Sequence, residues 1–209
     1  MKERLLIIGA GGHGKVCADI ALKMNKWNEI FFLDDESKEE VMGVKVLDTP
    51  SNFKKYINDS DFFVAIGDNS TRKKIIEELL LEEIQLPTLI HPNTIISQNI
   101  KIDYGTVVMA GVIINCCTEI GKGCIINTGV TIDHDCLIKN YIHISPGTNI
   151  AGTVIIENET WIGIGSIVSN NILITNNCKL GAGTIVIKDI TIPGIYVGIP
   201  AKRIKKRNE

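Results

Sequence analysis

The chain has 209 residues, of which 44% are hydrophobic and 22% charged, a composition that suits one large or two small globular domains. Its formal net charge of −2 excludes a strongly basic protein, so we expect no nucleic-acid partner and no polybasic membrane anchor. The apolar run Leu5–Ala10 is too short for a signal sequence, and the six cysteines include no CxxC pair. We therefore expect a cytoplasmic protein with reduced thiols and no membrane association.

The first predicted elements are a strand and a helix joined by a glycine-rich loop. Residues 5–8 are typical of a buried parallel strand, and residues 15–24 of a helix. Between them, residues 9–14 read GAGGHG, which matches the G-x-G-x-x-G spacing of nucleotide-binding loops. Because the N–H groups at the start of a helix attract anions, we expect phosphate binding here rather than a purely structural turn.

Further elements of a parallel sheet follow the loop. A strand at 31–33 ends in Asp34 and Asp35, about twenty residues beyond the last glycine, where an acid can meet a ribose hydroxyl. A later strand at 62–66 and a helix at 72–81 continue the alternation. The pattern predicts one half of a Rossmann-type nucleotide-binding sheet.

This α/β domain is expected to span residues 1–85. It is too short for the second half that a dinucleotide needs, so NAD is not the favoured ligand. A single nucleotide with a group attached, such as a nucleotide sugar, fits better. A nucleotidyltransferase is disfavoured as well, because the domain lacks the long, arginine-bearing glycine loop of those enzymes.

A strict repeat occupies the rest of the chain. Every sixth residue from Ile96 to Ile192 is aliphatic, and the residue four positions after each is small or β-branched, which suits short strands around a narrow interior. Small or turn-forming residues directly after each aliphatic residue are the predicted corners. A period of six fits neither a helix nor a flat sheet, so we expect an all-β solenoid over 90–197. Three cysteines fall on interior positions and are interpreted as apolar filler, not nucleophiles: Cys124, Cys136 and Cys178.

Two of the four histidines lie inside the repeat, away from its aliphatic positions. His134 lies between Asp133 and Asp135. A solenoid needs no imidazole at a corner, so we interpret His134 as a general base whose tautomer Asp135 holds. For His143, a surface position on a strand is nearly as consistent as a functional one. A zinc site made of three histidines would need one more imidazole than the repeat offers, so no metal is expected.

The hexad pattern resembles the hexapeptide-repeat, left-handed β-helix family, whose coils are triangular and whose members are usually homotrimers with active sites between subunits. The runs GAGGHG, FLDD and AIGDN, together with the sequence HDC at 134–136, narrow this resemblance to the sialic-acid O-acetyltransferase and bacillosamine N-acetyltransferase family. The best-known members acetylate UDP-4-amino sugars. The resemblance implies acetyl-CoA as co-substrate and a nucleotide sugar as acceptor.

The resemblance also implies roles for individual residues. His134 would be the catalytic base, His143 would contact acetyl-CoA, and Ile164 and Ala182 would line the pantetheine channel. The amide of Gly152 is a candidate oxyanion donor. In the N-terminal domain the resemblance places the phosphates, sugar and nucleoside against six residues: Gly12, His13, Gly14, Asp34, Asp35 and Gly67.

The end of the chain carries the sequence GIPAK, which fits the G-x-P-A-[KR] signature of hexapeptide acyltransferases. A basic tail over 198–209 follows the solenoid. Lys202 and Arg203 are candidate partners for the phosphates of CoA, together with three further basic residues: Lys205, Lys206 and Arg207.

The favoured function is N-acetylation of a nucleotide-linked 4-amino-4,6-dideoxy sugar by direct transfer from acetyl-CoA, with no acyl-enzyme. We expect the nucleotide to be UDP. O-acetylation of a sialic acid or another sugar hydroxyl is the alternative, since the same base and cleft would serve a hydroxyl. A non-catalytic nucleotide-sugar-binding solenoid is a second alternative.

Overall fold

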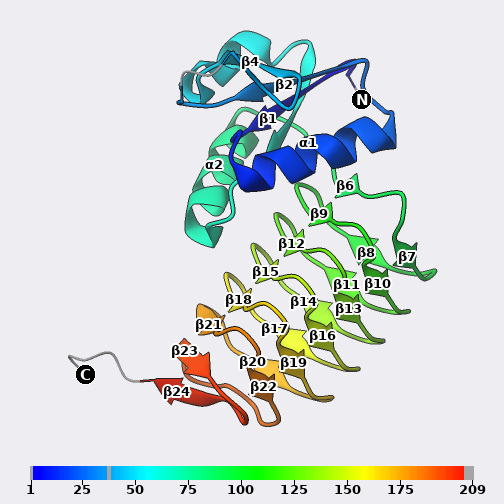
Figure 1. Cartoon of the computed structure of the whole chain (residues 1–209), viewed down its shortest axis with the longest axis vertical. Coiled ribbons are helices and arrows are strands. Elements are labelled where there is room, and N and C mark those ends of the chain that lie inside the picture. The colour runs from blue at the N-terminus through cyan, green and yellow to red at the C-terminus, as the bar shows by residue number, and fades with distance from the viewer. Residues whose placement is uncertain (1, 37–38, 205–209) are drawn as a thin grey trace. The chain divides into compact units, whose positions relative to one another are not determined.

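The computed structural model describes residues 2–36 and 39–204 of the chain. The chain divides into two compact units, Met1–Pro92 and Asn93–Glu209 (Figure 1). Among the described residues no helix has the length and apolar character needed to cross a membrane.

The first unit is an α/β domain built on a sheet of strand order β3-β4-β2-β1-β5. β1 pairs in parallel with β2 on one side and with β5 on the other, and only the β3–β4 pair is antiparallel. Leu5, Leu6 and Ile7 of β1 are fully buried, as expected for a central parallel strand covered on both faces. The elements are β1 (Arg4–Ile8), α1 (Gly12–Met24), β2 (Glu29–Leu33), β3 (Glu40–Val41), β4 (Val44–Asp48), the 3-10 helix η1 (Pro50–Tyr56), β5 (Ser60–Val64), α2 (Asn69–Leu81) and β6 (Leu89–Ile90).

Both helices begin three residues earlier than the sequence predicted. α1 starts at Gly12, inside the glycine loop, so part of that loop is the first helical turn. α2 starts at Asn69 because Asp68 caps it, accepting from the Thr71 amide at 2.9 Å. The Ser70 hydroxyl and the Thr71 amide both donate to this carboxylate and lower the pKa of Asp68 to about 2. β3, β4 and η1 were not predicted.

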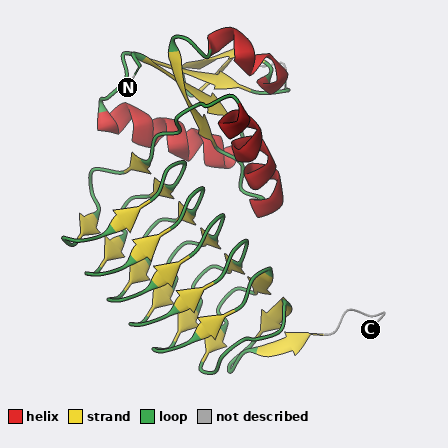
Figure 2. Cartoon of the chain, turned by 180° about the vertical axis from the view of Figure 1, so that it is seen from behind, coloured by secondary structure: helices red, strands yellow, loops and turns green. Residues whose placement is uncertain are grey.

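The second unit is a parallel β-helix whose short strands stack into three faces, confirming the predicted solenoid (Figure 2). The first face contains β9 (Val107–Val108), β12 (Ile125–Ile126), β15 (His143–Ile144), β18 (Trp161–Ile162), β21 (Cys178–Leu180), β23 (Gly194–Val197) and β24 (Lys202–Ile204). The second contains β7 (Ile95–Ile96), β10 (Ile113–Ile114), β13 (Thr131–Ile132), β16 (Asn149–Ile150), β19 (Ile167–Val168) and β22 (Ile185–Val186). The third contains β8 (Lys101–Ile102), β11 (Glu119–Ile120), β14 (Leu137–Ile138), β17 (Ile155–Ile156) and β20 (Leu173–Ile174).

The aliphatic residue of each hexad fills the interior. From Val108 to Val186 every one of these side chains is at most 2% exposed. The small residues that accompany them are buried too, and their polar atoms are paired: the Thr118 hydroxyl donates to the Asp133 carbonyl at 2.8 Å and accepts from the Cys136 amide. Cys124, Cys136 and Cys178 are buried as predicted.

The corners do not turn where the sequence analysis placed them. The left-handed backbone conformation falls on the third residue after each aliphatic position, not on the first, because the chain leaves the strand for two residues before it turns. This position accepts glycine at no steric cost, and asparagine more readily than most other side chains. The residues with positive φ at these corners are Asn99, Gly105, Gly111, Cys117, Gly123, Gly129, Asp135, Tyr141, Gly147, Thr153, Glu159, Gly165, Asn171, Asn177 and Gly183.

The repeat becomes less regular near its end. Ile192 keeps the aliphatic phase but lies outside any strand and is 56% exposed. After Gly194–Val197 the chain reverses, and Lys202–Ile204 pairs antiparallel with that strand. The described part of the expected basic tail is therefore an edge strand of the first face.

Candidate active site

His134 lies at the corner between the second and third faces, in the turn that joins β13 to β14. Its Nδ1 lies 2.7 Å from Oδ2 of Asp135, the partner that the sequence predicted. Asp133 braces the turn from the other side, since its Oδ1 accepts the His134 amide at 2.9 Å and the Asn115 side-chain amide at 2.8 Å. Backbone and side chain of His134 are thus held independently.

The surrounding acids set the protonation behaviour of this imidazole. The hydrogen bond to Asp135, followed by the charge of Asp133, raises the pKa of His134 above its ordinary value. The Asn115 amide and the His134 N–H lower the pKa of Asp133, which keeps that carboxylate ionised. With Nδ1–H directed at Asp135, the neutral ring carries its lone pair on Nε2. The His134 side chain is 51% exposed, so Nε2 is accessible to a ligand.

Gly152 occupies the equivalent position in the next coil and lies against the imidazole. A Cβ added at this residue would fall 2.6 Å from both Cε1 and Nε2 of His134, so any residue other than glycine would force the ring to move. The His134 amide is capped by the preceding Asp133, but Ala151 offers no such acceptor to Gly152. Among the described residues the Gly152 N–H has no acceptor, which leaves a donor beside Nε2.

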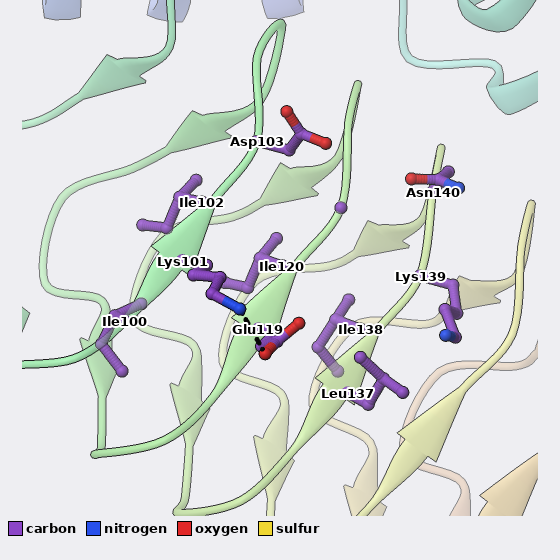
Figure 3. Close-up of a pocket in the computed structure, with 11 residues that line it drawn as sticks. Ile100, Lys101, Ile102, Asp103, Glu119, Ile120, Leu137, Ile138, Lys139 and Asn140 are labelled. Atoms are coloured by element: carbon purple, nitrogen blue, oxygen red, sulfur yellow. Dashed lines mark hydrogen bonds and ion pairs between the residues drawn. The ribbon is translucent and has the colours of Figure 1, made fainter.

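The second and third faces of the solenoid each carry a groove, and the groove on the second face includes Asp133, which precedes His134. A groove of about 430 Å³ on the second face is lined by residues that include Asn115, Asp133 and Ala151, next to His134 and Gly152. A larger one, about 660 Å³, lies on the third face around Lys101 and Glu119, which form an exposed ion pair at 3.0 Å (Figure 3). It contains no imidazole and no predicted site residue, and such exposed pairs contribute little energy. The smaller groove is therefore the better candidate for a substrate site.

His143 lies on the outer side of β15 in the first face. Its ring stacks on Trp161, with centroids 5.1 Å apart and planes 9° from parallel, and its Nε2 lies 3.3 Å from the Asn127 side-chain amide. Trp161 is fixed by a 2.8 Å hydrogen bond from Nε1 to the Ser145 hydroxyl, and the Lys179 ammonium lies 4.3 Å from its ring centroid. The imidazole is therefore held in one orientation.

Ile164 and Ala182 lie in successive coils at the corner between the first and second faces, and both are exposed. His134 and Gly152 lie at a different corner, between the second and third faces. A single β-helix thus brings the predicted base together with the predicted oxyanion donor, but it does not bring either to the predicted pantetheine residues.

The basic residues at the end of the chain are placed only in part. Lys202 and Arg203 are exposed on β24, where the Arg203 Nε donates to the Pro193 carbonyl at 3.3 Å. The other predicted basic residues lie outside the described part of the chain: Lys205, Lys206 and Arg207. Within residues 2–36 and 39–204 no group of three or more His, Cys, Asp or Glu side chains is placed to hold a metal ion. The expectation that the protein uses no metal stays a prediction.

The first unit has a cavity of about 350 Å³ at the carboxyl ends of β1, β2 and β5, beside the start of α1. Such crevices at the ends of parallel strands are the usual ligand sites of α/β sheets. Four of the six predicted residues line it: Gly12, His13, Asp34 and Gly67. Gly14 and Asp35 are not part of the lining.

The glycines of the loop have distinct roles. Gly14 is buried against the carbonyl of Gly9, and a Cβ there would clash with that oxygen, so glycine at this position permits close packing of the loop. Gly12 has open space where a Cβ would be, at the first turn of α1. The N–H groups of this turn can bind an anion. His13 Nε2 lies 3.7 Å from the Cys17 thiol, one helical turn on.

Asp34 is occupied with the protein itself. Its Oδ2 accepts the Ala10 amide at 2.6 Å and its Oδ1 accepts the Glu36 amide at 2.9 Å, so this carboxylate fixes the glycine loop. The sequence predicted that Asp34 contacts the nucleoside and did not indicate Glu36, which also lines the cavity. The predicted site residues also did not include Trp161 and Asn127, which contact His143. A tryptophan at the outward position 18 residues after His143 is a signal that could have found the stack, because outward residues of successive coils are neighbours.

Comparison with known proteins adds to this geometry. A family model described as the PglD N-terminal domain matches residues 4–79. UDP-N-acetylbacillosamine N-acetyltransferase of Bacillus subtilis is 36% identical over 112 residues, so the match spans about half of each protein, 52% of this chain and 52% of that relative. The acetyltransferase domain of PglB from Neisseria gonorrhoeae, solved in complex with acetyl coenzyme A, is 36% identical with a TM-score of 0.95. The similarity covers 98% of this chain and 100% of that domain.

The chain belongs to the PglD-like hexapeptide-repeat acetyltransferases. A further member with a similar structure is perosamine N-acetyltransferase from Caulobacter crescentus, solved as a histidine-to-asparagine mutant in complex with CoA and GDP-perosamine. It is 31% identical to this chain with a TM-score of 0.90, and the similarity covers 97% of each chain. Membership in this family agrees with the resemblance read from the sequence.

Proposed function

We propose that the protein transfers the acetyl group of acetyl-CoA to the amine of a nucleotide-linked amino sugar. One observation carries this proposal: His134 is paired with Asp135 through Nδ1, and its Nε2 lies beside the unoccupied N–H of Gly152. The relatives support it, since the Neisseria domain was solved with acetyl coenzyme A and the Caulobacter enzyme with CoA and GDP-perosamine.

The chemistry follows from the two groups at the corner. His134 Nε2 would take the proton from the sugar amine as the nitrogen attacks the thioester carbonyl, a role worth about 10²- to 10⁴-fold in rate. The Gly152 N–H would donate to the carbonyl oxygen as negative charge develops on it. Asp135 would stabilise the imidazolium that forms, and this imidazolium would give its proton to the CoA thiolate that leaves as the C–S bond breaks. Neither step needs a covalent enzyme intermediate.

The acceptor would be held through its nucleotide by the first unit. The phosphates fit the N–H groups of Gly12 and His13 at the start of α1, beside the cavity that Gly67 lines. We propose a UDP-linked 4-amino-4,6-dideoxy sugar as the substrate, as the resemblance implies. The basic residues Lys202 and Arg203 would serve the phosphates of CoA.

We propose a homotrimer with its active sites between subunits. His134 and Gly152 occupy one corner of the prism, and Ile164 and Ala182 occupy another, with the whole second face between them. If both pairs contact one acetyl-CoA, a neighbouring subunit must supply the second pair. Ile164, an apolar side chain that is 56% exposed, would be covered by this arrangement.

The test is a thiol-release assay with acetyl-CoA against UDP-, GDP- and dTDP-linked 4-amino sugars, with free sialic acid included. We expect turnover with an amino sugar and an acetamido product by mass spectrometry. Turnover with sialic acid alone would show that the protein is an O-acetyltransferase and not an N-acetyltransferase. No turnover above background with any acceptor would refute the proposal.

Subunit mixing tests the shared site. His134→Ala and Ile164→Trp are each expected to lose most turnover, whereas trimers reassembled from both variants regain part of it at interfaces that combine one intact residue from each chain. Light scattering gives the subunit number. A monomer, or mixed oligomers without recovered turnover, would contradict a site between subunits.

A further inference from the structure

Two adjacent free thiols lie directly beneath the dyad. Equivalent residues of successive coils are 18 apart, so Cys116 occupies the position of His134 in the preceding coil, and Cys117 that of Asp135. The backbone confirms the stacking, because the Asp135 N–H donates to the Cys116 carbonyl at 3.1 Å. Neighbouring coils are about 4.8 Å apart. The backbone of Cys116 is therefore about one coil spacing from the backbone of His134.

These two cysteines differ from the others in accessibility. Cys116 and Cys117 are exposed, and the remaining four are buried: Cys17, Cys124, Cys136 and Cys178. A thiol reagent in solution will meet the exposed pair first. Neither cysteine has a place in the acetyl-transfer chemistry, so the pair is free for another reaction.

The two thiols are not equivalent. The adjacent Cys116, followed by partial burial and the charge of Asp135, raises the pKa of Cys117 and disfavours its thiolate. Cys117 also occupies the left-handed corner position, with φ of 61°. Cys116 is the residue that shares its column with His134 and Gly152, where the thioester sulfur would lie. Cys116 is thus the better placed nucleophile.

We propose that Cys116 is a site of mixed-disulfide formation with coenzyme A, at which CoA disulfide blocks the acetyl-transfer corner. This inference rests on the proposed function, because it needs the pantetheine arm to be bound with its sulfur near His134. The Cys116 thiolate attacks one sulfur of CoA disulfide and forms a new S–S bond. The original S–S bond breaks, and the second CoA leaves as a thiolate that takes up the proton Cys116 lost.

Binding supplies the selectivity. A CoA disulfide seated in the groove presents its sulfur to Cys116 at a high effective concentration, whereas glutathione disulfide has no such site. The attached pantetheine would then lie across Gly152 and the imidazole, and acetyl-CoA could not bind. A reducing thiol would restore the site.

The experiment follows adduct formation by intact-protein mass spectrometry on the full chain treated with CoA disulfide or glutathione disulfide at equal concentration. We expect one CoA adduct per chain, formed about tenfold or more faster than the glutathione adduct. Cys117→Ser keeps the adduct and Cys116→Ser loses it. Equal rates for the two disulfides, or an unchanged adduct in Cys116→Ser, would overturn the assignment.

Turnover gives an independent readout. Activity should fall in proportion to the labelled fraction and return with dithiothreitol, while Cys116→Ser stays active throughout. Fully labelled protein with full activity would show that Cys116 does not control the corner. If untreated protein acetylates no acceptor, the proposed function fails, and the mass measurement still decides whether CoA disulfide selects Cys116.

Discussion

The imidazole of His134 rests on the backbone of Gly152, which leaves 2.6 Å between Nε2 and the place where a Cβ would be. This contact places the proposed base against the proposed oxyanion donor. The absence of a side chain at position 152 therefore sets the position of the imidazole relative to the Gly152 N–H. Gly152 has no positive φ, so the requirement for glycine here comes from the neighbouring ring and not from the backbone conformation.

Gly152→Ala should therefore displace the imidazole without unfolding the coil. A shift of about 1 Å in a reacting group can cost about 10²-fold in rate, and we expect a loss of that order in kcat. Steady-state kinetics measure it, with circular dichroism to check the fold. Asn170→Ala, at the exposed equivalent position one coil further on, is the matched control and should retain full activity. Unchanged kcat in Gly152→Ala would separate the glycine from catalysis.

The pairing of His134 with Asp135 gives a prediction about pH. The base acts when neutral, so activity should rise as pH increases through the pKa of His134, which the Asp135 hydrogen bond and the Asp133 charge raise. Asp135→Asn weakens the hydrogen bond to Nδ1, so the acidic limb of kcat should move to lower pH. The plateau should fall about 10- to 100-fold, as is typical when the partner of a functional histidine is removed.

The measurement is a pH–rate profile for wild type, Asp135→Asn and a control, Asp103→Asn, an exposed acid at a different corner. The control should leave the profile unchanged. An acidic limb that stays in place in Asp135→Asn would mean that another group titrates in the profile, and His134 would lose its assignment as base.

The stack of His143 on Trp161 leads to a third prediction. Aromatic pairs of this kind contribute about 0.5–1.5 kcal/mol beyond their buried area, so Trp161→Leu should loosen the imidazole and raise KM for acetyl-CoA roughly 2- to 10-fold. Trp161→Phe retains a ring and should recover most of the affinity. KM for the nucleotide sugar serves as the internal control. A change in that KM instead would place the stack on the acceptor side.

The sequence predicted the solenoid well because its interior is a one-dimensional pattern. Each aliphatic residue from Val108 to Val186 is buried by the same contacts in every coil, so periodicity alone specifies the core. His134 and Asp135 could be paired because adjacent residues need no tertiary information. The contact between His134 and Gly152, in contrast, depends on how far the chain travels before it turns, and the corners were placed two residues too early.

The nucleotide cavity was predicted less completely for a different reason. The motif located the glycine loop and the ends of the strands, but it did not show which polar groups are already hydrogen-bonded within the fold. Asp34 has the expected position, yet both of its oxygens accept backbone N–H groups. Arg72 carried no signal in the sequence, because a charged residue in a helix is usually exposed.

Arg72 is 1% exposed and holds the loop that lines the cavity. Its guanidinium donates to the carbonyls of Ile66 and Gly67, each at 3.0 Å, and to the Asn69 side chain at 2.7 Å. Lysine is a point charge that cannot reproduce this planar arrangement. Arg72→Lys should leave at least one buried acceptor unpaired and lower the free energy of unfolding by about 1–3 kcal/mol.

Because Gly67 lines the cavity, the same substitution should weaken nucleotide-sugar binding. We expect KM for the nucleotide sugar to rise several-fold while KM for acetyl-CoA stays constant, since the residues proposed to bind CoA lie in the other unit. Thermal unfolding and steady-state kinetics with each substrate varied in turn measure the two effects. Lys74→Met, an exposed cation on the same helix, is the control. If the loop positions the nucleotide, disturbing the loop must change the affinity for the nucleotide sugar. Lower stability with both KM values unchanged would therefore give Arg72 a purely structural role.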